Sequence, residues 1–121
     1  MPTDGVPQEL IKVRAFQVAP PELEGVLLDH PEIVDAAVIG VPDPSNQEGS
    51  EAPRAYIVRR DTKSNKPSSQ EVYEWVKERL ASYKRLNGGV IFVDAIPKNA
   101  SGKILKRMLR DQAKKEMEAK L

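Results

Sequence analysis

The sequence predicts an α+β fold: a small three-stranded sheet with packed helices and a short N-terminal hairpin. Three features of the 121 residues support this class: short apolar runs rich in β-branched residues, apolar stripes at helical spacing, and the alternation of the two along the chain. The chain contains no cysteine, which excludes disulfides, thiol catalysis and cysteine-based metal sites. A chain of this length can bury a stable apolar core without them.

The hairpin and the first helix begin the predicted fold. Residues 10–13 and 16–18 form two short extended segments, which predicts a small antiparallel hairpin. Pro20-Pro21 can occupy the first turn of a helix, and His30-Pro31 ends it. The apolar face of this helix has the spacing i, i+3, i+4 and consists of Leu23, Val26 and Leu27.

Three further segments predict the strands of the sheet. Ile33 to Val41 is an almost continuous apolar run, as in a strand that is covered on both faces. Residues 42–53 are rich in turn-forming residues and predict a mobile surface loop. Ala55 to Val58 predicts the second strand, and Val90 to Val93 predicts the third.

Two more helices complete the fold. Ser68 and Glu71 have the spacing of a capping box, and the helix that follows has an apolar stripe of Val72, Trp75, Val76 and Leu80. We interpret Trp75 as a core anchor of this helix; a ligand-stacking role is the alternative. The stripe of the last helix consists of Leu105, Met108, Leu109, Ala113 and Met117.

No complete catalytic constellation is visible in the sequence. Its 31% of charged residues and the lack of an apolar run near the roughly 20 residues of a membrane span predict a domain without a transmembrane helix. His30 lies beside a proline at a helix end, which favours a structural role. The carboxylates lack metal-ligand spacing, and neither a P-loop nor a GxGxxG motif occurs. We therefore expect the domain to supply part of a site.

The net charge of +1 conceals a separation of charge along the chain. Residues 21–53 contain no Lys or Arg and eight acidic residues, namely Glu22, Glu24, Asp29, Glu32, Asp35, Asp43, Glu48 and Glu51. Residues 84–110 contain Asp94 and seven basic residues, namely Lys84, Arg85, Lys98, Lys103, Lys106, Arg107 and Arg110. Such a basic segment can attract an anion locally, and a merely solvated face is the alternative.

The segment Pro-Lys-Asn-Ala-Ser-Gly-Lys, residues 97–103, is the strongest candidate for chemistry. Gly102 permits an unusual turn, and the pattern predicts that Lys103 lies where the last helix begins. A cation in the first helical turn opposes the positive end of the helix dipole, at a cost of roughly 0.3–1 kcal/mol. An incoming phosphate or carboxylate would remove that cost. A surface lysine that extends into water explains the same residues equally well.

A second candidate lies in the hairpin. Lys12 and Arg14 are two positions apart on an extended segment and therefore point to the same face, while Ile11, Val13 and Phe16 can pack beneath them. Two cations on one face can hold phosphates, and Gln17 adds a neutral donor and acceptor.

These segments together resemble the C-terminal domain of the adenylate-forming (AMP-binding) enzymes, such as acyl-CoA synthetases, 4-coumarate:CoA ligases and firefly luciferase. The resemblance rests on the runs ELIKVRAFQVAPPELEGVLLDHPEIVDAAVIGVPD, EAPRAYIV and ASYKRLNGGVIFVDAIPKNASGKILKR, and covers about Glu9 to Arg110. It implies a ligase C-terminal lid domain, one face of which serves adenylation while the opposite face serves thioester formation with coenzyme A. A large N-terminal domain would bind ATP and the carboxylic acid.

The resemblance also implies roles for individual residues. Lys103, in the motif Pro-Lys-x-x-x-Gly-Lys, matches the catalytic adenylation lysine, which bridges the substrate carboxylate and the α-phosphate. Lys12 and Gln17 match residues that contact the acyl-adenylate. Arg14 and Ala15 match the coenzyme A path, where Arg14 replaces a common Lys and Ala15 replaces the usual Gly. Lys84 and Arg85 are further candidates for contacts with the coenzyme A phosphates.

The start of the chain departs from the family pattern, because Gly5-Val6 stand where an Asp-Arg hinge pair is usual. We interpret residues 1–8 as a linker or leader and residues 9–121 as the C-terminal domain of a ligase whose N-terminal domain is absent here. This domain alone is expected to be inactive. The expected partners are that N-terminal domain, the acid, ATP and coenzyme A, with Mg²⁺ accompanying ATP and no metal ligands in this domain.

Two further expectations concern location and alternatives. Ala119-Lys120-Leu121 follow the pattern of a C-terminal peroxisomal signal, which predicts a peroxisomal protein; a cytoplasmic one is the alternative. One alternative function is the lid of a peptide-synthetase adenylation module, which would pass its adenylate to a carrier protein. The other is a non-enzymatic basic domain that binds nucleic acid, against which the acidic residues 21–53 and the lack of interleaved aromatics argue.

Overall fold

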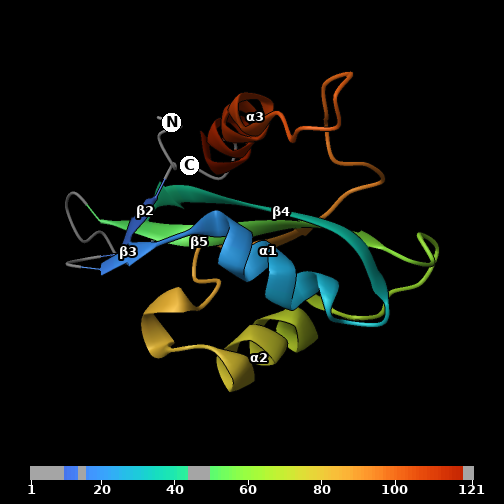
Figure 1. The fold of residues 1–121 in the computed structure, drawn as a ribbon, viewed down its shortest axis with the longest axis horizontal. Helices are drawn as coiled ribbons and strands as arrows, with labels where there is room; N and C mark the ends of the chain where they lie inside the picture. Colours follow the sequence, from blue (N-terminus) through green and yellow to red (C-terminus); the bar gives the residue numbers. More distant parts are fainter. Residues whose placement is uncertain (1–9, 14–15, 44–49, 119–121) are drawn as a thin grey trace.

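Helices cover both faces of a three-stranded sheet in the computed structural model, which describes residues 10–13, 16–43 and 50–118 (Figure 1). The strands are β4 (Ile33–Pro42), β5 (Glu51–Arg59) and β6 (Val90–Phe92), in the order β4-β5-β6. β4 pairs antiparallel with β5, and β6 pairs parallel with β5, so β4 is an edge strand. The predicted α+β class and the predicted order of elements are confirmed.

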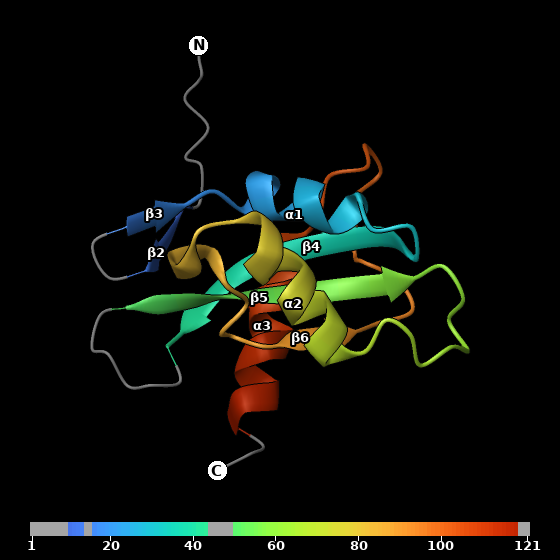
Figure 2. The same cartoon turned by 90° about the horizontal axis from the view of Figure 1, so that it is seen from below.

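Alternating side chains of the strands divide the core in two. On one face, Ala36 and Val38 pack against α1 (Pro20–Leu28) and α2 (Ser69–Arg79). On the other face, Ala37 and Ile39 pack beneath α3 (Lys106–Glu118). Because successive strand residues point to opposite faces, a strand that is covered on both sides must be apolar at nearly every position. Figure 2 shows α1 and α2 in front of the sheet and α3 behind it.

The N-terminal hairpin lies beside one end of this sheet. It consists of β2 (Ile11–Val13) and β3 (Phe16–Val18), which pair antiparallel, with Lys12 opposite Gln17. Ile11, Val13 and Val18 are buried in the same core as α1 and α2. Phe16 does not pack beneath the hairpin, because its ring lies at the surface, stacked on Tyr83 of the short 3-10 helix η1 (Ser82–Lys84) at 4.1 Å between ring centroids.

The helix signals in the sequence have clear physical counterparts. Leu23 and Leu27 of α1 are fully buried, and Pro20 starts that helix. The capping box of α2 is present: Ser68 Oγ accepts a bond from the Glu71 amide, and Glu71 accepts one from the Ser68 amide. His30 Nδ1 accepts a hydrogen bond from the Glu32 amide, which agrees with a structural role.

Trp75 packs at the edge of the core. Its indole nitrogen donates to the carbonyl of Val26 at 2.8 Å, and the guanidinium of Arg79 lies over its ring at 3.2 Å. The ring of His30 lies against it at 4.6 Å between centroids. The hydrogen bond to Val26 joins α2 to α1, as expected of a core anchor.

Three boundary or burial predictions were wrong. The strand predicted from Ala55 begins at Glu51, because pairing with β4 continues to Pro42; the predicted loop 42–53 shortens accordingly, and its residues 44–49 lie outside the described residues. The last helix begins at Lys106. Met108 is 55% exposed, because the buried stripe of α3 is limited to Leu109 and Ala113, while the side chain of residue 117 is not described.

Candidate functional site

The loop that carries Lys103 is a tight turn between β6 and α3. Lys98 and Ile104 form an antiparallel bridge at its base, and the amide of Leu105 donates to the carbonyl of Pro97 at 2.8 Å. The amide of Asn99 donates to the carbonyl of Lys103 at 2.9 Å. The main chain on either side of the turn is therefore held together by backbone hydrogen bonds.

The Asn99 side chain organises the inside of this turn. Its Oδ1 accepts hydrogen bonds from the amides of Ser101 and Lys103, each at 3.0 Å, and from the Ser101 hydroxyl at 2.8 Å. Gly102 has a φ of 87°, a left-handed conformation that residues with a Cβ rarely adopt. Asparagine and glycine are thus needed here for the shape of the turn, and that shape fixes the backbone of Lys103.

Lys103 itself lies on the surface, outside the helix. α3 begins at Lys106, so the prediction that Lys103 occupies the first helical turn, and the dipole argument based on it, were wrong. The physical reason is the Lys98–Ile104 bridge, which keeps this part of the chain extended. The Lys103 side chain is exposed, and no hydrogen bond or ion pair of its ammonium group is found within the described part of the chain. Its charge is therefore available to an incoming anion.

Both ends of the loop are attached to the body of the domain by ion pairs. Lys98 Nζ lies 2.6 Å from Asp35 Oδ2 on β4. Lys106 Nζ contacts Glu24 Oε2 of α1 and donates to the carbonyl of Val38 at 2.6 Å. Sequence analysis placed these lysines in the basic segment but did not identify their partners.

The hairpin brings two other candidates together. Lys12 and Gln17 occupy opposite positions of β2 and β3, and both side chains are exposed. The amide of Lys12 donates a hydrogen bond to Glu51 Oε1 at 2.9 Å. Lys12 and Glu51 both border an open hollow of about 560 Å³. Arg14 and Ala15 lie outside the described residues, so their predicted place on the coenzyme A path stays a prediction.

Lys84 has a partner within the domain. Its Nζ lies 2.7 Å from Glu22 Oε1, and this hydrogen bond raises the pKa of Lys84 above its usual value. Its neighbour Arg85 borders a cavity of about 320 Å³ together with the stacked rings of Phe16 and Tyr83. Among the described residues, the buried Nε of Arg85 has no hydrogen-bond partner, and its guanidinium forms no ion pair. Since Lys84 is paired with Glu22, Arg85 is the freer cation of the two.

The hairpin and the Lys103 loop lie at opposite ends of the molecule. In Figure 1 the hairpin is on the left and the orange loop before α3 is on the right, and the second view in Figure 2 agrees. The structure therefore brings Lys12 and Gln17 together but keeps them apart from Lys103.

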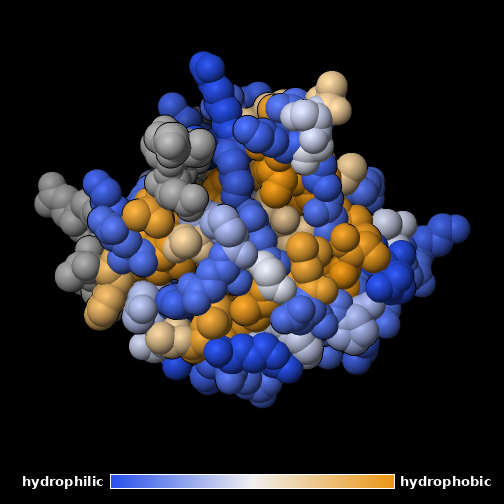
Figure 3. All heavy atoms as spheres, in the orientation of Figure 1, coloured by the Kyte–Doolittle hydropathy of each residue, from blue (hydrophilic) through white to orange (hydrophobic). Residues whose placement is uncertain are grey.

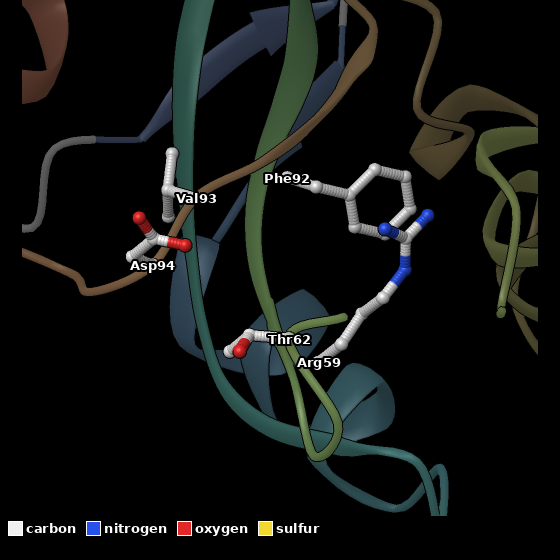
Figure 4. A pocket seen from close by; sticks show the side chains of 5 residues that line it. All are labelled: Arg59, Thr62, Phe92, Val93 and Asp94. Carbon is white, nitrogen blue, oxygen red and sulfur yellow. The ribbon is translucent and has the colours of Figure 1, made fainter. Parts of the chain in front are cut away.

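A smaller pocket next to β6 has a structural explanation. It measures about 190 Å³ and is lined by Arg59, Thr62, Phe92, Val93 and Asp94. Figure 4 shows the Arg59 guanidinium over the ring of Phe92, at 3.6 Å from its centroid. The same guanidinium donates to the carbonyls of Ser64 and Pro67, so it holds the loop after β5.

A buried polar cluster that the sequence did not predict lies beneath α3. Arg54 Nη2 and the Tyr56 hydroxyl both donate to Glu116 Oε1, at 2.7 and 3.0 Å. Burial raises the pKa of Tyr56 to about 12. Burial opposes ionisation of Glu116, but hydrogen bonds from Gln112, Arg54 and Tyr56 outweigh it and lower the pKa of Glu116. An arginine within an apolar strand sequence was the one available signal.

The surface offers few other candidates. Large hydrophobic side chains are exposed on four different elements, at Phe16, Leu28, Val34 and Met108, and Figure 3 shows hydrophobic patches divided by hydrophilic residues. Among the described residues, no group of three His, Asp or Glu is placed to bind a metal ion. None of the described helices is long and apolar enough to span a membrane.

The chain is similar over most of its length to several known ligases or ligase-like proteins. The phenylacetyl-CoA ligase epaB of Aspergillus niger is 59% identical over 105 residues, which are 87% of this chain and 19% of that protein. The 4-coumarate–CoA ligase-like protein 9 of Oryza sativa is 53% identical over 110 residues, which are 91% of this chain and 19% of that protein. The chain thus spans about a fifth of the length of these curated relatives.

Solved structures show the same fold. ATP-bound MatB from Rhodopseudomonas palustris has a TM-score of 0.77 at 32% identity, and the match covers 89% of this chain and 20% of that one. The anthranilate CoA ligase AuaEII in complex with anthranoyl-AMP has a TM-score of 0.78 at 32% identity, over 97% of this chain and 21% of that one. The family model described as the AMP-binding enzyme C-terminal domain matches residues 22–103. The chain therefore belongs to the family of AMP-binding enzyme C-terminal domains.

Proposed function

We propose that this chain is the mobile C-terminal lid domain of an ATP-dependent acyl- or aryl-CoA ligase. In the first half-reaction, a carboxylate oxygen attacks the α-phosphorus of ATP and expels pyrophosphate, which gives an acyl-adenylate. In the second, the thiol of coenzyme A attacks the acyl carbon, loses its proton and expels AMP. Similar proteins include a phenylacetyl-CoA ligase and a 4-coumarate–CoA ligase-like protein, which favours this pair of reactions.

The observation that carries the proposal is the exposed Lys103, whose ammonium group has no partner among the described residues, on a turn of fixed shape. Negative charge accumulates where the carboxylate approaches the α-phosphate. An ammonium group between the two would stabilise that charge more in the transition state than in the separate reactants, which is the requirement for catalysis. We propose that Mg²⁺ enters this site bound to ATP.

The hairpin supports a second position of the same domain. Lys12 and Gln17 present a cation and an amide side by side, and we assign them to the acyl-adenylate during thioester formation. Arg14 and Ala15 would line the coenzyme A path beside them. Because the hairpin and the Lys103 loop lie at opposite ends of the molecule, the domain must turn between the half-reactions. Of Lys84 and Arg85, Arg85 is the better candidate for a contact with a coenzyme A phosphate, since Lys84 is paired with Glu22.

The test is the variant Lys103→Ala in the full-length ligase that carries this chain. We expect ATP–pyrophosphate exchange to fall about 10²- to 10³-fold, because a preorganised charge is lost at the centre of reaction. Conversion of supplied acyl-adenylate to the thioester should stay within a few-fold of the unmodified enzyme. Lys63→Ala removes another exposed lysine and is the control. Equal loss in both half-reactions, or no loss in either, would contradict the proposal.

The same measurements separate the alternatives. A peptide-synthetase lid would serve transfer to a carrier protein in place of coenzyme A, whereas the relatives described above are named as CoA ligases or resemble them. A nucleic-acid surface is disfavoured, because Lys84, Lys98 and Lys106 are each paired with an acidic residue. The 121-residue chain alone should show no ATP–pyrophosphate exchange.

The peroxisomal address at Ala119-Lys120-Leu121 lies outside the described residues and stays a proposal.

A further inference from the structure

We propose that Lys106, paired with Glu24, is the positioning residue that holds the Lys103 loop in its working orientation. This inference rests on the proposed function of Lys103. It concerns two residues that come from opposite faces of the sheet, because α1 packs with one half of the core and α3 with the other. Their side chains meet at the open edge of β4.

The contact involves both polar backbone groups of Val38. Its amide donates to Glu24 Oε2 at 2.9 Å, and its carbonyl accepts from Lys106 Nζ at 2.6 Å. Glu24 and Lys106 also contact each other directly. An edge strand normally leaves such groups to water or to another strand, so these two charged side chains take the place of a neighbouring strand. The pair therefore has a defined geometry rather than the freedom of a surface ion pair.

Burial makes this pair the strongest attachment of the loop. The side chains of Glu24 and Lys106 are 14% and 23% exposed, against 27% and 37% for Asp35 and Lys98 at the other end of the loop. Partly buried charges are screened less by water, and removing one partner leaves the other poorly solvated. Loss of Lys106 would also leave the Val38 carbonyl without its side-chain donor.

The position of Lys106 couples this attachment to Lys103. Lys106 is the first residue of α3, and only Ile104 and Leu105 separate it from Lys103. Those two residues are bonded to the start of the loop through the Lys98–Ile104 bridge and the Leu105–Pro97 hydrogen bond. The loop is thus bonded internally as one unit, and Lys106 attaches its C-terminal end to the body of the domain.

The first experiment measures loop order in the full-length ligase by hydrogen exchange, on peptides that cover residues 98–105. Lys106→Met keeps the length of the side chain and removes its charge and donors. Glu24→Gln keeps an acceptor for the Val38 amide and removes the opposite charge, so it is the milder second variant. We expect exchange in the loop to rise about tenfold in both variants. Arg107→Met changes an exposed neighbour on the same turn of α3 and should leave exchange unchanged.

The second experiment measures the two half-reactions of the same variants. Lys106→Met should lower the kcat of adenylation about tenfold with little change in the KM for ATP, because Lys103 is still present but samples its position less often. Lys106→Arg, which can donate to both partners, should restore most of this loss. The conversion of supplied acyl-adenylate to the thioester should be unaffected. A purely structural role would lower both half-reactions together.

The outcomes separate this inference from the proposed function. If Lys103→Ala stops adenylation while Lys106→Met changes neither loop exchange nor adenylation, the positioning role is wrong and the function of Lys103 stands. If Lys103→Ala leaves adenylation intact, the proposed function is wrong, and the positioning of a catalytic lysine falls with it. Increased loop exchange together with a selective loss of adenylation supports both.

Discussion

Arg54 lies almost entirely inside the domain although it carries a charge. Its Nη1 donates to the carbonyl of Gly88 at 3.0 Å, and its Nη2 forms the ion pair with Glu116 at 2.7 Å. A buried guanidinium is tolerated only where a countercharge and hydrogen-bond acceptors replace water. Tyr56 shares the same carboxylate oxygen, so strand β5 and helix α3 are joined by one cluster of three side chains.

Substitution Tyr56→Phe tests this cluster at the level of one hydroxyl. Below pH 10 we expect the variant to be less stable by about 1–3 kcal/mol, because a buried hydrogen bond to a charged group is lost. The raised pKa of about 12 adds a dependence on pH. Between pH 10 and 12 the tyrosine ionises in the unfolded chain but not in the folded one, so the native protein loses stability as pH rises.

The expected size of that loss is roughly 2–3 kcal/mol over the two pH units, relative to Tyr56→Phe, which has no phenol to ionise at this position. Urea unfolding of the 121-residue chain from pH 8 to 12 measures it. Tyr73→Phe, which removes an exposed hydroxyl bonded to Asn87, controls for the loss of a tyrosine elsewhere. Parallel stability curves for the unmodified chain and Tyr56→Phe would show that Tyr56 does not titrate as proposed.

Individual residues differ in how well the sequence could predict their roles. Lys103 stands in a short motif with a glycine, so local spacing was enough to make it a candidate, and its catalytic role stays a prediction. The predicted local conformation of Lys103 was wrong, because a bridge and a turn centred on Asn99 replace the expected first helical turn. The partner of Lys106 could not be found at all, since Glu24 lies 82 positions away and meets it only through the packing of two helices on one strand edge.

At the scale of elements, the periodicity of the sequence predicted which helices and strands exist better than it predicted where they begin and end. β5 was recognised from Ala55 to Val58, its most apolar part, yet it begins at Glu51. The missed part contains Pro53 and Arg54, residues that disfavour a central strand by composition alone. Tertiary contacts explain both residues. The carbonyl of Pro53 accepts a hydrogen bond from the Gly88 amide, and Arg54 forms an ion pair with Glu116.

Two glycines allow a paired prediction about elements. Gly25 is exposed on α1, and a Cβ there would meet nothing within 4 Å, so Gly25→Ala should stabilise the domain by about 0.5–1 kcal/mol through helix propensity. A Cβ on Gly88 would lie 2.8 Å from the carbonyl oxygen of Pro53 and 2.9 Å from that of Ala52. The backbone atoms of β5 cannot shift without disturbing the sheet, so Gly88→Ala should lower the free energy of unfolding of the domain by about 1–3 kcal/mol.

Urea unfolding at neutral pH measures both changes, and each variant is the control for the other, since both add one methyl group. Equal effects of the two substitutions would show that the close packing of the Gly88 turn against β5 does not limit stability.

At the scale of the whole molecule, the separation of charge along the chain becomes pairing in space. Lys84, Lys98 and Lys106 from the basic segment meet Glu22, Asp35 and Glu24 from the acidic one, respectively. Each pair links α1 or β4 to a part of the chain after α2. The near balance of charge therefore has a structural role. Of the four lysines in the basic segment, Lys103 is the one whose ammonium group takes no part in this pairing within the described residues.

The distance between the hairpin and the Lys103 loop yields a prediction about the order of chemistry. Lys12→Ala and Gln17→Ala, made in the full-length ligase, should lower thioester formation from supplied acyl-adenylate by about tenfold or more, because each removes one of the polar contacts to the adenylate that we propose for that state. ATP–pyrophosphate exchange should change less than threefold, since the hairpin is then turned away from the reaction centre. Lys103→Ala should give the reverse pattern.

Such opposite effects follow only if the domain presents its two ends in turn. A lid that closed in a single orientation would place one of the two segments far from the chemistry throughout, and its variants would affect neither half-reaction. A flexible tether without defined positions would let both sets of variants reduce both half-reactions. Single-turnover measurements of each half-reaction on the same three variants, with Lys63→Ala as the shared control, distinguish these cases without any change in substrate.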